Sequence, residues 1–302
     1  HVLTKKDEVI LSKAEHASNV LPWLELQKEV GFKIKYVPLD KDLKLTLDNL
    51  KSVVTKNTKV ISIAHITNTV GDIRPIKEIG KFAKENNIYF VVDGAQSVPH
   101  LKTDVNDLNI DFLAFSGHKM LGPTGIGVLY GKYSLLDKTS PINFGGGMNT
   151  SFEANGEFEY KSLPTRLEAG TQNIEGVLGL GTAIDYLNSI GMENIHKYEL
   201  ELRKYLVNEL EKIDNKNLIV KGFINNMNEY MNKASVIIAK PGGLTSTEIT
   251  MMRKPFVLMM PIPGVENYNA LFFENNGSLP AGSPVRYETA EQMKARFFRA
   301  LS

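Results

Sequence analysis

The chain has 302 residues, of which 42% are hydrophobic and 23% are charged, and its 35 basic residues nearly balance its 34 acidic ones. This composition is typical of a globular protein, and a net charge of +1 gives no electrostatic reason to expect nucleic acid as a partner. The absence of cysteine excludes disulfides, thiolate metal sites and a cysteine nucleophile within the sequence, and the six histidines include no HExxH pair, so we expect no metal site.

The first residues, HVLTKKDEVILS, lack the apolar region of a signal peptide. No apolar run approaches the roughly 20 residues that a membrane-spanning helix needs, so we expect no membrane span and a cytoplasmic protein. The chain does not begin with methionine. We therefore expect it to derive from a longer or processed protein, which leaves organellar targeting open.

Short runs rich in β-branched residues alternate with longer helical segments as far as about Asn215. Strands separated by helices predict an α/β fold with a mostly parallel sheet covered by helices. The predicted strands are Glu8–Leu11, Lys33–Val37, Lys59–His65, Ile88–Asp93, Asp111–Ser116 and Gly125–Tyr130.

Three helices are predicted with clear ends. A helical pattern covers residues 74–87, where Pro75 fits the first turn. Two long helices are predicted over 174–191 and 192–213, and Gly191 is expected to end the first of them.

A second α/β pattern follows, in which a strand, a glycine turn, a helix, another strand, a loop and a helix succeed one another. Because its motifs differ from those of the first part, we expect two domains. Residues 1–215 would form a large domain, and residues 216–302 would form a partial Rossmann-like α/β segment.

Polar side chains follow the ends of three predicted strands. Asp93 ends one strand, Ser116, His118 and Lys119 lie just past the next, and His16 lies in the loop after the first strand. Alone, each has an ordinary structural explanation, such as a turn cap or a solvated cation. Because the carboxyl ends of parallel strands form one edge of the sheet, their combination favours a functional site there.

An acid, a lysine and a flat ring together suit pyridoxal phosphate. The lysine amine forms an imine with this cofactor, and a carboxylate keeps the ring nitrogen protonated, which makes the ring an electron sink. A histidine ring offers a flat partner for stacking, while hydroxyl and backbone N–H groups can bind the phosphate. These residues therefore predict a pyridoxal-phosphate enzyme.

Residues 1 to about 213 resemble the large domain of Suf-type cysteine desulfurases, in the class V aminotransferase group of fold-type I pyridoxal-phosphate enzymes. The resemblance implies a fold like that of other pyridoxal-phosphate-dependent transferases, a small amino acid as substrate and a homodimer. The stretches that carry it are EHASNVLPW, HITNTVGDIRPIKEI, VVDGAQSVPH, FSGHKMLGPTGIGVLYG, INFGGGMN and RLEAGTQNIEG.

The resemblance assigns roles to eight residues. It implies that Lys119 forms the Schiff base and later moves a proton, that Asp93 pairs with the pyridine nitrogen, and that His16 stacks on the ring. The other implied cofactor contacts are Gln96 at the ring hydroxyl, Asn68 beside that hydroxyl and the substrate carboxylate, Ser116 and His118 at the phosphate, and Thr171 at the phosphate from the neighbouring subunit.

The resemblance also implies parts that this sequence does not contain. A phosphate-binding opening segment is expected before residue 1, so the large domain would be N-terminally incomplete. The family's C-terminal domain would carry a sulfur-accepting cysteine and a carboxylate-binding arginine, yet the sequence has no cysteine. We therefore expect an enzyme similar to cysteine desulfurase or selenocysteine lyase without the acceptor cysteine, and we favour selenocysteine because selenide leaves more easily.

Residues 222–277 are similar to the nucleotide-binding half of glycosyltransferases of the diacylglycerol glucosyl and galactosyl synthase type. A Gly-Gly turn before a helix can present N–H groups to a diphosphate, although many β-turn-α units contain such a turn. The implied sugar-nucleotide contacts are Gly242, Gly243, Glu248, Glu266 and Asn269.

Three hypotheses follow from these two resemblances. The first is a pyridoxal-phosphate enzyme, which accounts for the largest part of the sequence. The second is a glycolipid glycosyltransferase that uses a UDP-sugar. The third is a catalytically silent chimera or scaffold, because parts of two different enzymes are joined in one chain.

Overall fold

A computed structural model of the chain describes residues 3–212, 226–240, 242–254, 256–258, 268, 269, 271 and 272. The chain divides into two compact units, His1–Phe223 and Ile224–Ser302. The domain boundary predicted after residue 215 lies outside the described residues. None of the described helices is long and apolar enough to cross a membrane.

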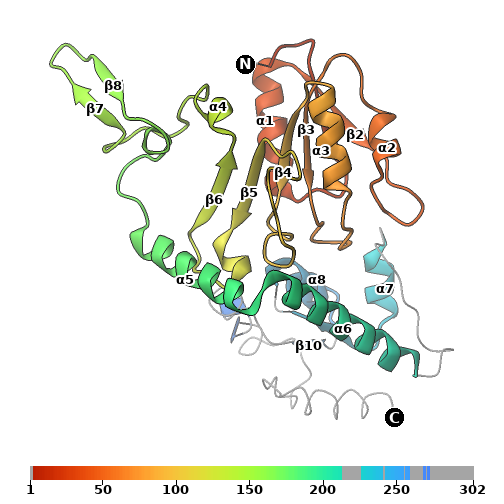
Figure 1. The fold of residues 1–302 in the computed structure, drawn as a ribbon. Helices are drawn as coiled ribbons and strands as arrows, with labels where there is room; N and C mark the ends of the chain where they lie inside the picture. The colour runs from red at the N-terminus through yellow and green to blue at the C-terminus, as the bar shows by residue number, and fades with distance from the viewer. Residues whose placement is uncertain are drawn as a thin grey trace. The chain divides into compact units, whose positions relative to one another are not determined.

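A six-stranded sheet forms the centre of the first unit (Figure 1). Its strand order is β2-β1-β3-β4-β5-β6, and all neighbours pair in parallel except β5 and β6, which are antiparallel. This sheet confirms the predicted α/β fold with a mostly parallel sheet. The strands are β1 (Glu8–Ser12), β2 (Lys33–Val37), β3 (Thr58–Ala64), β4 (Tyr89–Asp93), β5 (Phe112–Ser116) and β6 (Gly127–Gly131).

The helices of this unit follow the strands in the predicted alternation, and the long helices α5 and α6 come last. A small hairpin of β7 (Asn149–Phe152) and β8 (Phe158–Tyr160) precedes them. The helices are α1 (Leu21–Val30), α2 (Leu47–Lys51), α3 (Ile76–Glu85), α4 (Tyr133–Leu136), α5 (Ile174–Ile190) and α6 (Met192–Glu211), and the 3-10 turns are η1 (Ala17–Asn19), η2 (Gly117–Met120) and η3 (Thr165–Leu167).

Several predicted element boundaries are shifted by one or two residues, and two of these shifts have a clear local reason. Pro75 precedes α3 instead of lying in its first turn, because its ψ of 66° is not helical. The last strand of the sheet begins at Gly127 and not at Gly125, because Gly125 adopts a left-handed φ of 75° that belongs to the turn before it. Gly191, with φ of 90°, ends α5 as predicted.

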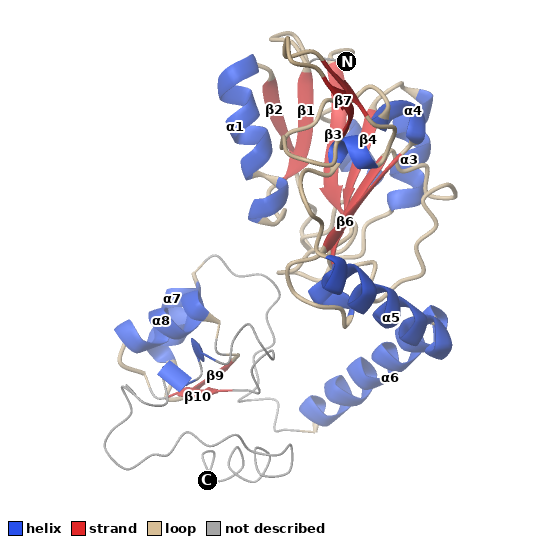
Figure 2. Cartoon of the chain, turned by 90° about the vertical axis from the view of Figure 1, so that its left-hand side faces the viewer, coloured by secondary structure: helices blue, strands red, loops and turns tan. Residues whose placement is uncertain are grey.

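Alternate strand residues pack on opposite faces of the sheet, because successive side chains of a strand point in opposite directions. In β1, Ile10 packs in the cluster that contains Ile76 and Ile79 of α3, whereas Val9 and Leu11 pack on the side of α1. Figure 2 shows α1 and α3 on opposite sides of the sheet. Burial of each such side chain contributes roughly 1.5–3 kcal/mol, so the sheet firmly supports the loops at its ends.

The second unit contains a strand, a helix and a parallel strand in the predicted order. Its small core consists of Met231, Ile249 and Leu258. The described elements are α7 (Met227–Lys233), β9 (Ile237–Ala239), α8 (Gly243–Met251) and β10 (Phe256–Leu258). The Rossmann-like classification of this unit stays a prediction.

Candidate functional site

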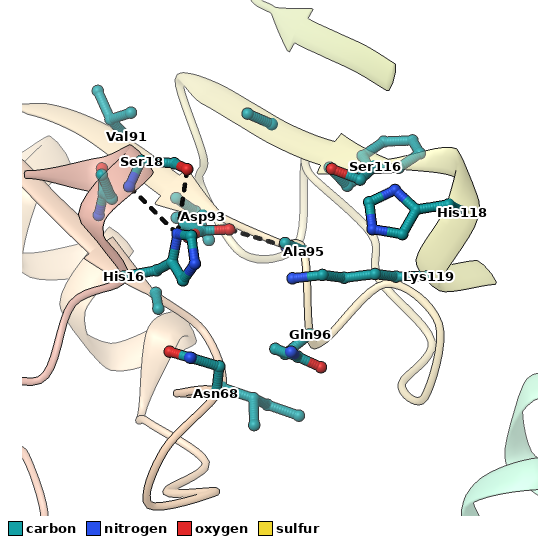
Figure 3. A pocket seen from close by; sticks show the side chains of 16 residues that line it. His16, Ser18, Asn68, Val91, Asp93, Ala95, Gln96, Ser116, His118 and Lys119 are labelled. Atoms are coloured by element: carbon teal, nitrogen blue, oxygen red, sulfur yellow. Dashed lines mark hydrogen bonds between the residues drawn. The ribbon is translucent and has the colours of Figure 1, made fainter. Parts of the chain in front are cut away.

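A cavity of about 390 Å³ lies at the carboxyl edge of the sheet, where β3, β4 and β5 end (Figure 3). This volume lies within the range of roughly 300–1,000 Å³ that is usual for small-molecule sites. Seven of the eight residues expected to hold the cofactor line this one cavity. They are His16, Asn68, Asp93, Gln96, Ser116, His118 and Lys119.

Asp93 lies at the end of β4, and the chain turns directly after it. Its Oδ1 accepts a hydrogen bond from the Ala95 N–H at 2.9 Å, so the carboxylate is fixed by the turn that it begins. Gln96 lies in the same turn and also lines the cavity. The local sequence thus holds an acid and an amide on one side of the cavity.

Lys119 is presented by η2, a tight turn between β5 and β6. The turn needs Gly117, since a Cβ there would lie 2.8 Å from the Ile126 side chain, while the Gly117 N–H donates to the Ile126 carbonyl at 2.9 Å. Leu121 ends the turn with a left-handed φ of 64°. Figure 3 shows the half-buried Lys119 side chain extending across the cavity toward the side where His16 lies.

His16 faces the cavity from the loop after β1, where it caps η1. Its Nδ1 accepts a hydrogen bond from the Ser18 N–H at 3.1 Å and lies 3.0 Å from Ser18 Oγ. Because a backbone N–H can only donate, Nδ1 is the acceptor in this contact, which leaves Nε2 to carry the ring hydrogen. The ring plane is therefore held by its own turn.

Asn68 lines the cavity from the loop between β3 and α3. This loop closes on itself, since the Thr67 N–H donates to the Asp72 carbonyl at 3.3 Å and the Gly71 N–H donates to the Thr67 carbonyl at 3.0 Å. Gly71 has a left-handed φ of 72°, which a residue with a side chain adopts only with strain. The loop thereby places an exposed amide at the edge of the cavity.

Six further residues were predicted from the sequence, one for the cofactor and five for a sugar nucleotide. Thr171 is exposed near the start of α5 and does not line the cavity, and its predicted contribution from a neighbouring subunit stays a prediction. In the second unit, Gly242 caps α8, Gly243 begins it, and Glu248 lies exposed on it. Asn269 is half-buried, and Glu266 lies outside the described residues, so the sugar-nucleotide assignment also stays a prediction.

A buried polar network behind the cavity was not predicted from the sequence. The guanidinium of Arg74 forms an ion pair with the carboxylate of Glu15, and both side chains are 0% exposed. Asn19 and Ser18, which line the cavity, were also missed. One signal was present for Glu15, an acidic residue directly before His16 in the loop after a buried strand.

His65 follows β3 and is buried next to the cavity wall. Burial alone lowers its pKa from 6.5 to about 4, so the ring is neutral near pH 7. Among the described residues, no group makes a hydrogen bond with its Nδ1. Its neighbours Ala64 and Ile66 line the cavity, whereas His65 itself does not.

Known proteins resemble this chain in sequence and in structure over about 70% of its length. The chain is 43% identical over 212 residues to a probable cysteine desulfurase from Halalkalibacterium halodurans, and the match covers 70% of this chain and 52% of that protein. A crystal structure of the cysteine desulfurase CsdA from Escherichia coli superposes with a TM-score of 0.67 at 37% identity, covering 70% of this chain and 52% of that one. A cysteine desulfurase from Thermococcus onnurineus gives 0.65 at 38% identity, covering 68% and 52%.

The chain thus spans about half the length of the relatives it matches. Residues 1–234 match the family described as Aminotransferase class-V. This family depends on pyridoxal phosphate, the cofactor expected from the sequence. Because the match covers well over half of the sequence, the chain belongs to the class-V aminotransferase family.

Proposed function

We propose that the chain acts as a pyridoxal-phosphate-dependent enzyme of the cysteine desulfurase type, with Lys119 as the residue that binds the cofactor covalently. The observation that carries this proposal is the cavity that gathers seven of the predicted cofactor residues. These residues lie at the ends of strands or in the loops that follow them, at four different strands, β1, β3, β4 and β5, so their convergence depends on the fold and not on sequence proximity.

The residues that line the cavity fit this cofactor. When bound, pyridoxal phosphate supplies an electron sink that stabilises negative charge on the α-carbon of an amino acid. Asp93 holds a proton at the ring nitrogen, the flat ring of His16 stacks on the cofactor ring, and Gln96 binds its hydroxyl. Ser116 and His118 donate hydrogen bonds to the phosphate.

Lys119 has two roles in this proposal. Its Nζ would hold the cofactor, and the same amine would move a proton at the substrate α-carbon. Among the described residues, no ion pair engages Lys119, so its amine is available for both roles. Asn68, at the rim of the cavity, orients the substrate carboxylate.

The substrate class is an amino acid with sulfur or selenium on its β-carbon. The sequence contains no cysteine, so no thiol of these residues can accept the leaving group. We therefore place selenocysteine ahead of cysteine, because selenide departs more readily than sulfide. A second copy of the chain, which would bring Thr171 to the phosphate, is part of the same proposal.

A trapping experiment tests this function. We expect borohydride reduction of the purified chain with pyridoxal phosphate to attach one cofactor, which mass spectrometry of peptides locates on Lys119. Lys119→Ala should abolish this adduct, because the reacting amine is gone. Lys102→Ala removes an exposed lysine that pairs with Glu193 at 3.2 Å and should leave the adduct unchanged. Absence of the adduct from the native chain, or attachment at other lysines only, would contradict the proposal.

A further inference from the structure

The buried ion pair between Glu15 and Arg74 joins the two loops that carry His16 and Asn68. Glu15 lies in the β1–α1 loop directly before His16, and Arg74 lies at the end of the β3–α3 loop that contains Asn68. Neither Glu15 nor Arg74 lines the cavity. Any effect of this pair on a ligand therefore passes through the residues that do line it.

The carboxylate of Glu15 is fully engaged by the protein. Its Oε1 accepts hydrogen bonds from Ser12 Oγ at 2.5 Å and from Arg74 Nη1. Its Oε2 accepts from the Ala64 N–H at 2.7 Å and from Asn19 Nδ2 at 2.9 Å. Ala64 and Asn19 line the cavity, so Glu15 directly holds two residues of the cavity wall.

The guanidinium of Arg74 completes the connection. Its Nη1 donates to the Ala64 carbonyl at 3.2 Å, and its Nη2 donates to Ser12 Oγ at 2.6 Å. The Arg74 N–H donates to the His65 carbonyl at 2.9 Å, which closes the base of the loop that carries Asn68. Arg74 thus bonds the ends of both β1 and β3 and anchors the loop beyond them.

Stability alone is a weak explanation for such a pair. Removing two charges from water costs about as much as their attraction returns, and a buried ion pair can often be replaced by uncharged residues without loss of stability. A forked guanidinium and a carboxylate do fix geometry, because each hydrogen bond has a required direction. We therefore attribute to this pair a role in fixing the positions of the two loops.

We propose that Glu15 and Arg74 are positioning residues that hold His16 and Asn68 in register around the pyridoxal-phosphate ring. This inference rests on the proposed function. It adds that the buried pair fixes the positions of His16 and Asn68 relative to each other. It also predicts that His16 loses its fixed tautomer when the pair is removed, whether or not cofactor is present.

The test uses the full chain with Glu15→Gln and Arg74→Met together. Glutamine keeps an acceptor for the Ala64 N–H, and methionine fills a similar volume without charge, so cooperative unfolding should be retained. We expect the dissociation constant for pyridoxal phosphate, measured by absorbance titration, to rise about tenfold or more, as is common when supporting residues of a site are lost. A control with Lys77→Gln and Asp107→Asn removes an exposed ion pair at 2.6 Å and should change this constant less than about twofold.

A second measurement is made without the cofactor. Ring ¹⁵N signals of His16, assigned by their loss in His16→Gln, should show the Nε2–H tautomer in the native chain and a mixture of tautomers in the double variant. Positioning is overturned if the double variant keeps both the native dissociation constant and the native ring signals. If the native chain binds no pyridoxal phosphate, the proposed function fails, while the ring signals still decide the positioning role.

Arg74→Lys replaces the double variant if the latter does not fold. Lysine keeps the charge but cannot donate to Glu15, Ser12 and Ala64 with the same fork. We expect a change in the same direction, about threefold or more in the dissociation constant, with partial mixing of the His16 tautomers. Native values for both quantities in a folded Arg74→Lys chain would overturn the proposal.

Discussion

At the amino end of the sheet the carboxylate of Glu8 is buried and bonded to the protein, whereas at the carboxyl end the carboxylate of Asp93 lines a cavity. Glu8 Oε2 accepts from Thr55 Oγ1 at 2.6 Å and lies 3.0 Å from Lys35 Nζ. Burial opposes ionisation of Glu8, but the hydrogen bonds from Thr55 and Lys35 outweigh it, and the net effect lowers its pKa.

Asp93 is held differently. Its Oδ1 accepts from the Ala95 N–H in its own turn, and its carboxylate faces the cavity shared with Lys119 (Figure 3). The same chemical group is therefore satisfied by the protein at one end of the sheet and presented to a ligand at the other. The difference separates structural from functional acids in this fold, because parallel strands bring only their carboxyl ends to the loops that form sites.

The largest expected effect concerns His65. This residue lies at the carboxyl end of the sheet, but like Glu8 it is buried and does not line the cavity. Its folded-state pKa of about 4 is below the unfolded value of 6.5, so the unfolded chain binds the proton first as the pH falls. Stability should therefore decrease between pH 6.5 and pH 4, by about 3 kcal/mol for this group. Urea unfolding at a series of pH values measures this loss.

The variant His65→Asn should flatten the pH dependence over that window, since asparagine does not titrate. His196→Gln, on α6, removes a histidine outside the buried sheet and serves as the matched control. If the slope between pH 6.5 and pH 4 is the same in His65→Asn as in the native chain, burial of His65 is not its cause.

The second prediction compares Glu8 with Asp93 by substituting each carboxylate with its amide. Glu8→Gln removes a charge that Lys35 and two threonine hydroxyls engage, and we expect a loss of about 2 kcal/mol in the free energy of unfolding. Asp93→Asn should change stability by less than about 0.5 kcal/mol. It should weaken pyridoxal-phosphate binding by roughly tenfold or more, because the charged partner of the ring nitrogen is lost.

Chemical unfolding and absorbance titration of both variants measure these quantities. Glu8→Gln should bind the cofactor as the native chain does, since it lies at the opposite end of β1 from the cavity. The comparison between the two ends fails if Glu8→Gln weakens binding as much as Asp93→Asn does, or if Asp93→Asn destabilises the fold by the larger amount.

The parts of the site that could be predicted from the sequence are those marked by a local pattern of residues. The strand that ends at Asp93 and the turn that carries Lys119 are both visible as an apolar run followed by polar or glycine residues. The antiparallel direction of β6 was also accessible, because residues 117–126 are too few for the crossover of a dozen or more residues that a parallel pair needs.

The network behind the cavity was not accessible in this way. Glu15 and Arg74 are 59 residues apart, and neither belongs to an apolar or turn pattern that would mark it as buried. Both are buried only because β1 and β3 are neighbours in the sheet and bring their following loops together. Pairings of this kind depend on strand order, which the spacing of residues along one sequence does not reveal.

The smallest expected effect concerns Ser18, which contacts His16 through both its hydroxyl and its backbone. Ser18→Ala removes the hydroxyl at 3.0 Å from Nδ1 but keeps the N–H that donates to Nδ1 at 3.1 Å. We therefore expect a loss of only about 0.5 kcal/mol in the free energy of unfolding. The Nε2–H tautomer of His16, observed through its ring ¹⁵N signals, should persist.

This outcome would assign the orientation of the ring to the backbone of η1, and so to the loop that Glu15 anchors. A shift of His16 toward the Nδ1–H tautomer in Ser18→Ala would instead make the hydroxyl the controlling group, and the backbone of η1 would not be sufficient to fix the ring. The backbone explanation is the stronger one, because the N–H can only donate, whereas the hydroxyl can donate or accept and so imposes no tautomer.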